Sequence, residues 1–246
     1  MLPYVNIHTH RPTGRGIELR TAGVHPWEAD PQAVEALAAR LTAGSGAAET
    51  AGKVAERLCG EASEAVGART AGNGVTGVQH VEAGAGCVQG AADVQAIGET
   101  GLDFARAVPR DVQFAALRAQ LDLARRTGRP VVLHCVRAFE PLMRELAACE
   151  PRAVIFHGFI GSPEQARQAL GRGYFLSFGE RAFASPRTLR ALHETPLGQL
   201  FFETDDAEVS IEEIYARAAE ALGRPVEELQ RATLENYKRL FETQNG

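Results

Sequence analysis

A chain of 246 residues with 45% hydrophobic and 23% charged residues has the composition of an ordinary globular protein and the length for one large domain or two small ones. Its net charge of −5 excludes a general attraction to nucleic acid, although nearly all of its basic residues are arginines, which bind phosphate through a planar fork. Because no apolar run reaches about 18 residues and the N-terminus lacks the layout of a signal peptide, we expect a cytoplasmic protein without a membrane span.

The predicted elements alternate between strands and helices along the chain. The first expected strand covers residues 4–10, "YVNIHTH", and a helix is expected to begin at Asp30, just before a proline. Later strands are expected at 94–99, 130–134, 153–157, 174–179 and 200–205. The expected helices between them are 112–128 and those that start at Ser162, Ser185 and Ser210. Continuous apolar runs are typical of parallel strands covered on both faces, so the sequence predicts an α/β fold with a parallel sheet.

One segment does not fit this alternation. Residues 42–93 are nearly half alanine and glycine and show no sustained periodicity, which predicts a loose, mobile insertion of low complexity. The segment contains "GNGVTG" (72–77), which matches G-x-G-x-x-G. Because no apolar strand precedes this motif and no clear helix follows it, we do not interpret it as a dinucleotide-binding loop.

Potential metal ligands recur where the expected strands end. In "NIHTH", His8 and His10 lie two residues apart, so in a strand both imidazoles face the same side. Four later strands end on a histidine or a carboxylate, at Glu99, His134, His157 and Asp205. Since the carboxyl ends of parallel strands meet at one edge, where active sites of such folds are built, we expect all six side chains to come together.

Six such ligands are too many for one ion but suit two divalent ions that share a carboxylate. Glu99 is the expected bridge, with His8, His10 and Asp205 on one ion. His134 and His157 are expected to hold the other ion. Mixed nitrogen and oxygen ligands fit Zn²⁺ or Mn²⁺, and Mg²⁺ less well. Two neighbouring ions can activate a water for attack at phosphorus, so the sequence predicts metal-assisted hydrolysis.

Seven blocks of the sequence resemble, in order, the signature motifs of the TatD family of metal-dependent hydrolases within the amidohydrolase superfamily. They are "NIHTH", "AGVHPW", "AIGETGLDF", "PVVLHCVRA", "VIFHGFIGS", "YFLSFG" and "FFETD". The resemblance implies a TIM-barrel-like fold and a divalent-metal-dependent deoxyribonuclease with 3′→5′ exonuclease character, acting on single-stranded DNA ends. An alternative that it leaves open is an ester hydrolase such as a D-aminoacyl-tRNA deacylase.

The resemblance also implies roles for individual residues. It implies the same six ligands, with Glu99 as the bridge and Asp205 as the acceptor of the proton from the attacking water. It places His25 near the substrate phosphate and Glu203 beside Asp205, both as substrate-binding residues. The sequence itself adds Arg137, which follows a strand end and is suited to gripping a phosphate oxygen.

The sequence departs from the family pattern at three places besides the insertion. Asn6 stands where an aspartate is usual, which raises a question about tuning of the ligands rather than about ligation. "DAE" (206–208) replaces the usual proline after "ETD". The stretch from His10 to His25 is short for a full strand and helix, which predicts either a seven-stranded barrel or a strand formed differently from "GIELRTAG" (16–23).

Other chemistries fit less well. A carbamylated or Schiff-base lysine needs a lysine at a strand end, and Lys53 and Lys238 lie elsewhere. Cys135 should point away from His134 because neighbours on a strand face opposite sides, so a Cys–His nucleophile is not expected. A non-catalytic, metal-retaining nucleic-acid-binding module remains an alternative. We expect a monomer or a weak oligomer.

We therefore expect residues 1–246 to form a single hydrolase domain with the 42–93 insertion in a helix-to-strand connection, on the face opposite the active site. Deleting 43–92 should leave metal binding and catalysis intact. The check is the metal content and hydrolytic activity of a deletion variant that still unfolds cooperatively. Loss of metal binding in such a folded variant would contradict this placement.

Overall fold

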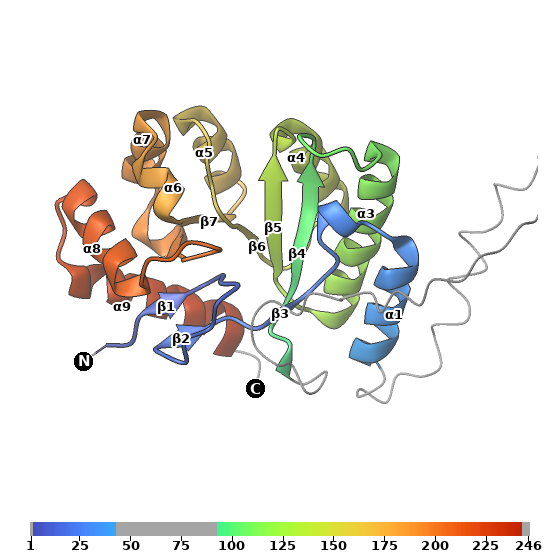
Figure 1. The fold of residues 1–246 in the computed structure, drawn as a ribbon, viewed down its shortest axis with the longest axis horizontal. Coiled ribbons are helices and arrows are strands. Elements are labelled where there is room, and N and C mark those ends of the chain that lie inside the picture. Colours follow the sequence, from blue (N-terminus) through green and yellow to red (C-terminus); the bar gives the residue numbers. More distant parts are fainter. Residues whose placement is uncertain (1, 43–92, 243–246) are drawn as a thin grey trace, which may run out of the picture.

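The computed structural model describes residues 2–42 and 93–242. In these ranges strands alternate with helices that lie outside them (Figure 1). The strands are β1 (Val5–Asn6), β2 (Ile17–Glu18), β3 (Thr21–Ala22), β4 (Ala96–Asp103), β5 (Val131–Val136), β6 (Val154–Phe156), β7 (Phe175–Phe178) and β8 (Leu200–Phe202). The helices are α1 (Pro31–Thr42), α3 (Arg110–Thr127), α4 (Phe139–Cys149), α5 (Pro163–Leu170), α6 (Glu180–Phe183), α7 (Pro186–Glu194), α8 (Ile211–Leu222) and α9 (Val226–Tyr237), with short turns η1 (Pro26–Glu28), η3 (Leu197–Gln199) and η4 (Lys238–Glu242).

All the paired strands run parallel, in a six-stranded sheet of order β3-β4-β5-β6-β7-β8 and a two-stranded sheet of β1 and β2. Backbone hydrogen bonds join the two sheets. The Ile7 N–H donates to the Phe202 carbonyl at 3.1 Å, which connects the β1 segment to β8. On the other side, β2 and β3 follow each other closely and link β1 to β4. The strands therefore close into a barrel.

The second strand of the barrel comes from "GIELRTAG", in two pieces. Ile17–Glu18 pairs with β1, and Thr21–Ala22 pairs with β4. The Leu19 N–H donates to the Asn6 carbonyl, and the Gln95 N–H donates to the Arg20 carbonyl. When β2 and β3 are taken as one interrupted strand, the described residues contain a ring of seven strands, which is one of the two alternatives predicted from the short stretch between His10 and His25.

Alternate residues of the strands build the inside of the barrel. Each strand of the ring contributes at least one residue to a buried apolar cluster that ends at Tyr237 and Leu240 of the C-terminal helices. Its strand and near-strand members are Val5, Ile7, Leu19, Ala96, Val132, Ile155, Phe175 and Phe201. The intervening strand residues, such as Leu133, Phe156 and Phe202, pack outward against the helices. This two-residue alternation leaves the next inward positions for polar side chains.

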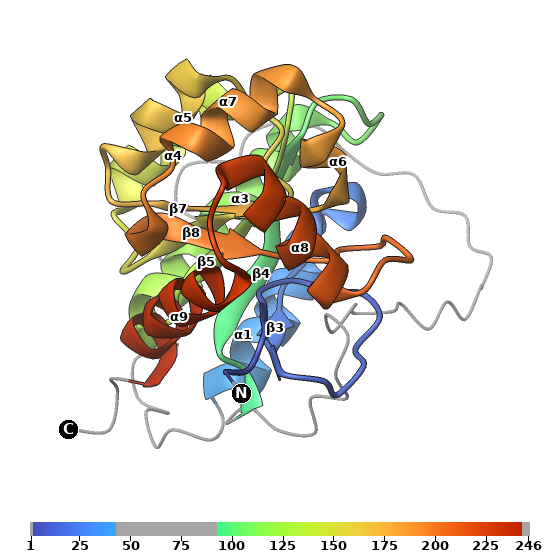
Figure 2. The same ribbon diagram turned by 90° about the vertical axis from the view of Figure 1, so that its left-hand side faces the viewer.

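The helices cover the outside of the barrel, with α8 and α9 on the side shown in Figure 2. Ser162, Ser185 and Ser210 each accept a hydrogen bond from the backbone N–H three residues on, so the three predicted helix starts are confirmed. Gly128 and Gly223 end α3 and α8 in the left-handed conformation. None of the described helices is long and apolar enough to cross a membrane.

Two strands are longer than predicted. β4 continues past Glu99 to Asp103, and β5 continues past His134 to Val136, so the prediction that Glu99 and His134 end their strands is wrong. The reason is tertiary pairing. Thr100 and Gly101 interrupt the apolar pattern, yet they pair with β5 and are buried. The predicted insertion is outside the described residues, apart from Thr42 and Asp93 at its ends, so its interpretation stays a prediction.

A buried tyrosine fixes the backbone of β1. The Tyr215 hydroxyl on α8 accepts a hydrogen bond from the Val5 N–H at 3.3 Å and donates to the Val5 carbonyl at 3.1 Å. It also lies 2.7 Å from the Thr233 hydroxyl of α9. Tyr215 therefore links the strand that precedes His8 to two outer helices.

We expect Tyr215→Phe to lower the free energy of unfolding by about 1–3 kcal/mol, because both backbone groups of Val5 lose a buried partner. Urea denaturation followed by circular dichroism measures this difference. Tyr174→Phe is the matched control, since the hydroxyl of this half-buried tyrosine makes no hydrogen bond among the described residues. Equal stability of the two variants would show that the Tyr215 hydroxyl is dispensable.

Candidate metal centre

The inward polar positions above the apolar interior of the barrel converge on the carboxylate of Glu99, which is 7% exposed. The structure brings all six predicted ligands to this place. They come from the segment after β1 (His8 and His10), from β4 (Glu99), from β5 (His134) and from the residues after β6 and β8 (His157 and Asp205). Glu99 itself lies at a register shift between Ile97 and Thr100, where β4 and β5 pair irregularly.

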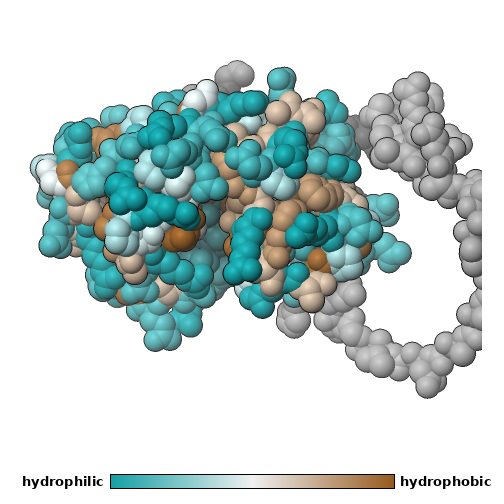
Figure 3. All heavy atoms as spheres, turned by 90° about the horizontal axis from the view of Figure 1, so that it is seen from above, coloured by the Kyte–Doolittle hydropathy of each residue, from teal (hydrophilic) through white to brown (hydrophobic). Residues whose placement is uncertain are grey.

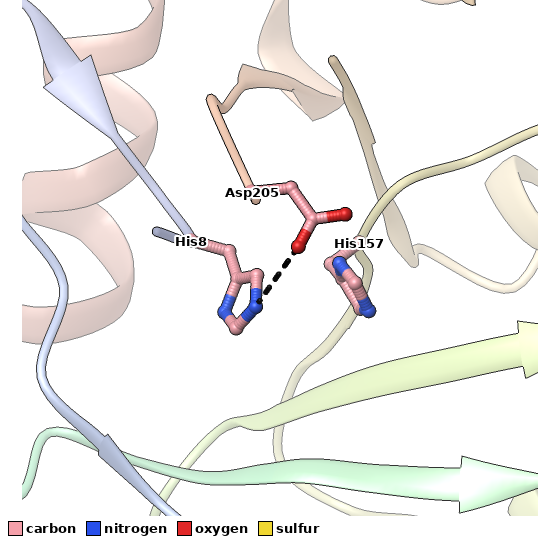
Figure 4. A group of neighbouring side chains, drawn as sticks. All are labelled: His8, His157 and Asp205. Atoms are coloured by element: carbon pink, nitrogen blue, oxygen red, sulfur yellow. Dashed lines mark ion pairs between the residues drawn. The ribbon is translucent and has the colours of Figure 1, made fainter. Parts of the chain in front are cut away.

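One oxygen of Glu99 faces the two histidines of the first segment. Its Oε2 atom lies 2.9 Å from His8 Nε2 and 3.6 Å from His10 Nε2. Asp205 Oδ1 completes this group, at 3.4 Å from His10 Nε2 and 3.8 Å from His8 Nε2. Figure 4 shows the side chains of His8, His157 and Asp205 pointing toward one another from three different segments. Asp205 has a positive φ of 53° and is held beside this segment by backbone pairing with Thr9.

The other oxygen of Glu99 faces three further imidazoles. Its Oε1 atom lies 2.6 Å from His157 Nε2, 2.9 Å from His134 Nδ1 and 3.1 Å from His25 Nε2. His134 Nδ1 and His157 Nε2 are themselves 3.3 Å apart. The carboxylate therefore stands between two groups of nitrogen atoms, with one oxygen turned to each.

The donor set fits divalent metal ions. Three groups of ligand atoms each lie within 4.8 Å of one another: His8–His157–Asp205, His8–His10–Glu99 and His25–Glu99–His134. Imidazole nitrogens together with carboxylate oxygens are the ligands of Zn²⁺, Mn²⁺ and related ions. Bound cations also stabilise an arrangement in which several imidazoles lie close together around one buried carboxylate.

His25 lies in direct contact with Glu99. Its Nδ1 atom accepts a hydrogen bond from the Trp27 N–H at 3.2 Å, which places the proton of the neutral ring on Nε2. That Nε2–H then donates to Glu99 Oε1. In this tautomer His25 orients the carboxylate, and the substrate contact predicted for it stays a prediction.

Glu203 lies behind His157, with none of its side chain exposed. It accepts hydrogen bonds from the Gly158 N–H at 2.6 Å and from the Ser177 hydroxyl at 2.5 Å, and it lies 3.3 Å from His157 Nδ1. A carboxylate on Nδ1 leaves Nε2 of the same imidazole available as a ligand. Among the described residues Glu203 contacts protein groups, and its predicted role in substrate binding stays a prediction.

The charges of the centre follow from this packing. Burial favours neutral Glu99, but the charge of His157 and hydrogen bonds from His10, His134 and His157 hold the pKa of Glu99 well below its ordinary value. Burial likewise opposes a charge on His157, yet Glu99 and Glu203 raise the pKa of its imidazole. Burial and the negative charge of Glu203 raise the pKa of Asp205 above its ordinary value.

Two neighbours of His134 were missed by sequence reasoning. Asp103 is buried at the end of β4, and its Oδ2 atom lies 3.2 Å from His134 Nε2 and 2.6 Å from Trp27 Nε1. Asp103 thus contacts the His134 nitrogen that faces away from Glu99, as Glu203 contacts the His157 nitrogen that faces away from Glu99. Asp103 follows Glu99 by four residues, so in one continuous strand the two side chains face the same side. This spacing indicates a place in the centre only if β4 is known to continue past Glu99. Trp27 carried no signal beyond its block "AGVHPW".

Asn6 joins the two strands that carry the first group of ligands. Its amide donates to the Thr204 hydroxyl at 2.9 Å and accepts from the Thr204 N–H at 3.1 Å. The Thr204 hydroxyl in turn donates to the Thr9 hydroxyl at 2.9 Å. An amide can donate and accept at once, whereas an ionised carboxylate only accepts. Asparagine at this position therefore suits the hydrogen bonds that hold Asp205 beside His8 and His10.

A cavity of about 590 Å³ adjoins the centre over the ends of β5 to β8. Its lining combines metal-centre residues with apolar Phe159 and Ile160 and with the exposed arginines Arg137 and Arg187. Figure 3 looks onto the carboxyl ends of the strands and shows a hollow near the middle of this face. The predicted Arg137 thus lies at the cavity beside the centre.

Cys135 is not a nucleophile at neutral pH. Burial raises the pKa of its thiol to about 12, so the reactive thiolate does not form under ordinary conditions. The sequence-based exclusion of a Cys–His pair agrees with this value.

Comparison with known proteins identifies related chains. Residues 17–242 match the family described as "TatD related DNase". The "Uncharacterized metal-dependent hydrolase YjjV" of Escherichia coli (strain K12) is 32% identical over 168 residues, which are 61% of this chain and 64% of that protein. The "Deoxyribonuclease TATDN3" of Homo sapiens is 29% identical over 59% of each chain. The "3'-5' ssDNA/RNA exonuclease TatD" of Edwardsiella piscicida is 38% identical over 46% of this chain and 45% of that protein.

Solved structures show the same architecture. The crystal structure of YjjV from Escherichia coli aligns with a TM-score of 0.57 at 29% identity, over 62% of this chain and 66% of that one. A TatD family hydrolase from Entamoeba histolytica aligns with a TM-score of 0.59 at 17% identity, over 92% of this chain and 75% of that one, which shows the fold alone. The chain spans less than two thirds of the length of the curated relatives that it matches.

Glu203→Gln should weaken the affinity for divalent ions about 10- to 100-fold, because the amide cannot accept all the hydrogen bonds that fix His157. Titration of metal-free protein with Mn²⁺ in a calorimeter measures this loss. The matched control is Glu208→Gln, which changes an exposed carboxylate that pairs with Arg11 after the same strand. If both variants bind Mn²⁺ like the parent, Glu203 does not support the ligand.

Proposed function

The chain belongs to the family of TatD-related DNases, and from this premise we propose that it is a metal-dependent deoxyribonuclease that removes nucleotides from single-stranded DNA ends with 3′→5′ polarity. The proposal includes two divalent ions at the centre around Glu99. It rests above all on the division of this carboxylate, with Oε2 toward His8 and His10 and Oε1 toward His134 and His157.

The proposed chemistry divides between bound ions and the protein. When bound, divalent ions at this centre supply Lewis-acid chemistry that makes water more acidic and neutralises charge on a phosphate. Glu99 stays ionised between the two groups of imidazoles and holds them in one arrangement. Glu203 and Asp103 keep the rings of His157 and His134 oriented from behind.

Asp205 is the proposed acceptor of the proton from the attacking water. It lies at the edge of the centre, next to the cavity, and is more exposed than Glu99. Its position at the edge of the cavity lets its carboxylate reach a water beside the centre, which a general base requires. Glu203 is fully buried and occupied by three donors, so it is not positioned for this role.

A phosphodiester substrate is supported by the surroundings of the centre. Arg137 and Arg187 line the cavity and can bind phosphate oxygens, and the apolar Phe159 and Ile160 offer contacts to a sugar or base. The names of the human and Edwardsiella relatives, a deoxyribonuclease and an exonuclease on single-stranded DNA and RNA, agree with this class of substrate.

Digestion of end-labelled single-stranded DNA with Mg²⁺, Mn²⁺ or Zn²⁺ tests the proposal. We expect stepwise shortening from the 3′ end, and a fall in kcat of about 10²- to 10⁴-fold in Asp205→Asn because the general base is lost. Asp122→Asn, in an exposed ion pair on α3, is the control and should cleave like the parent.

Metal analysis of the same preparations should find two ions per chain after reconstitution. The nuclease assignment fails if the parent leaves DNA intact with every ion, or if Asp205→Asn cleaves as fast as the parent. Release of an amino acid from aminoacyl-tRNA by a parent that leaves DNA intact would favour the deacylase instead.

A further inference from the structure

Trp27 is the side chain beside the metal centre that the proposed function does not use. It is 46% exposed, whereas among the described residues the other large hydrophobic side chains, except Ile160, are more deeply buried. It is also the single tryptophan of the whole sequence. A scattered exposed apolar residue needs no explanation, but this one is fixed next to the centre.

Two contacts of the indole ring and one of its own backbone hold Trp27 in place. Its Nε1–H donates to Asp103 Oδ2 at 2.6 Å, and Asp103 is itself buried. The Arg106 guanidinium lies over the ring, with its carbon 3.7 Å from the ring centroid. The Trp27 backbone N–H donates to His25 Nδ1. A ring fixed in this way loses little conformational freedom when a ligand binds to it.

The ring stands one side chain away from the proposed reaction site. Its centroid is 4.6 Å from that of His25 and 6.0 Å from that of His134, and both histidines contact Glu99 Oε1. It does not line the cavity described above, which extends over β5 to β8, and it lies on the β3–β4 side of His134. The cavity and Trp27 therefore lie on opposite sides of His134. A DNA strand with one nucleotide in the cavity would place its neighbouring nucleotide on the Trp27 side.

We propose that Trp27, together with Arg106, is a stacking platform for an unpaired nucleobase next to the scissile phosphodiester. The inference rests on the proposed function and adds the residues that hold a base; since every base offers a π-face to an aromatic ring, this platform accepts single strands of any sequence. Arg106 is 52% exposed, which leaves its guanidinium able to stack on the same base or to bind the next phosphate. Paired bases in a duplex present no free face to the ring.

Trp27 fluorescence tests the contact directly, because the chain has no other tryptophan. The parent, with Mg²⁺, is titrated with a single-stranded phosphorothioate oligonucleotide and with an oligonucleotide of equal length that lacks its four terminal bases. We expect quenching at least tenfold stronger, at equal concentration, with the complete oligonucleotide. Equal quenching by both, or quenching by neither, overturns the proposal.

Kinetic measurements distinguish base stacking by Trp27 from a purely structural role in which Trp27 acts only through its hydrogen bond to Asp103. With cleavable phosphodiester versions of the two oligonucleotides, Trp27→Ala should raise KM for the complete one about 10- to 100-fold, as expected for loss of one stacked base. Trp27→Phe keeps an aromatic face and loses the bond to Asp103, so its KM should stay within about threefold of the parent. For the abasic oligonucleotide, all three proteins should have similar KM values.

Trp27→Ala and Trp27→Phe behave alike if Trp27 only orients Asp103 and His134. In that case both substitutions impair cleavage of the complete and the abasic oligonucleotide alike, and stacking is excluded. A parent that cleaves no DNA would overturn the proposed function, yet the fluorescence titration would still decide whether Trp27 binds a base. The failure of one proposal is therefore distinguishable from that of the other.

Discussion

A nearly buried carboxylate must be surrounded by positive or hydrogen-bonding groups, and Glu99 meets this requirement at the middle of the barrel. One of its oxygens contacts a histidine of the segment after β1. The other contacts histidines from β5 and from the residues after β6. The surrounding rings are fixed in turn by the buried Asp103 and Glu203. Five of the seven histidines in the sequence contact this one charge.

The barrel supplies these positions by simple alternation. Val132 and Ile155 fill the apolar interior, and the next inward residues along their strands are His134 and His157. In the last strand the same rule leads from Phe201 to Glu203, whereas Asp205 lies beyond the end of β8 and is placed by its pairing with Thr9. The apolar layer below gives the polar layer above a rigid, closely packed floor.

How much of the fold and of the metal centre can be predicted from the sequence depends on how close together in the chain the contacting residues are. The apolar runs before His134 and His157 are local patterns, and they predicted both the strands and the convergence of their ends. The length of β4 depends on pairing with β5, so Asp103 was missed. The part played by Asn6 depends on Thr204, which is 198 positions away and cannot be recognised from neighbouring residues. The contact between Glu203 and His157 likewise depends on tertiary packing.

Because β1 pairs with β8, the last strand, the two groups of ligand atoms around Glu99 become complete at different points during synthesis of the chain. Glu99, His134 and His157 are all present once the chain reaches residue 157, whereas His8 and His10 wait for Asp205 near the far end. The group around Glu99 Oε1 is therefore contained in a chain that ends at residue 157, whereas the group around Oε2 is complete only when the last strand closes the ring.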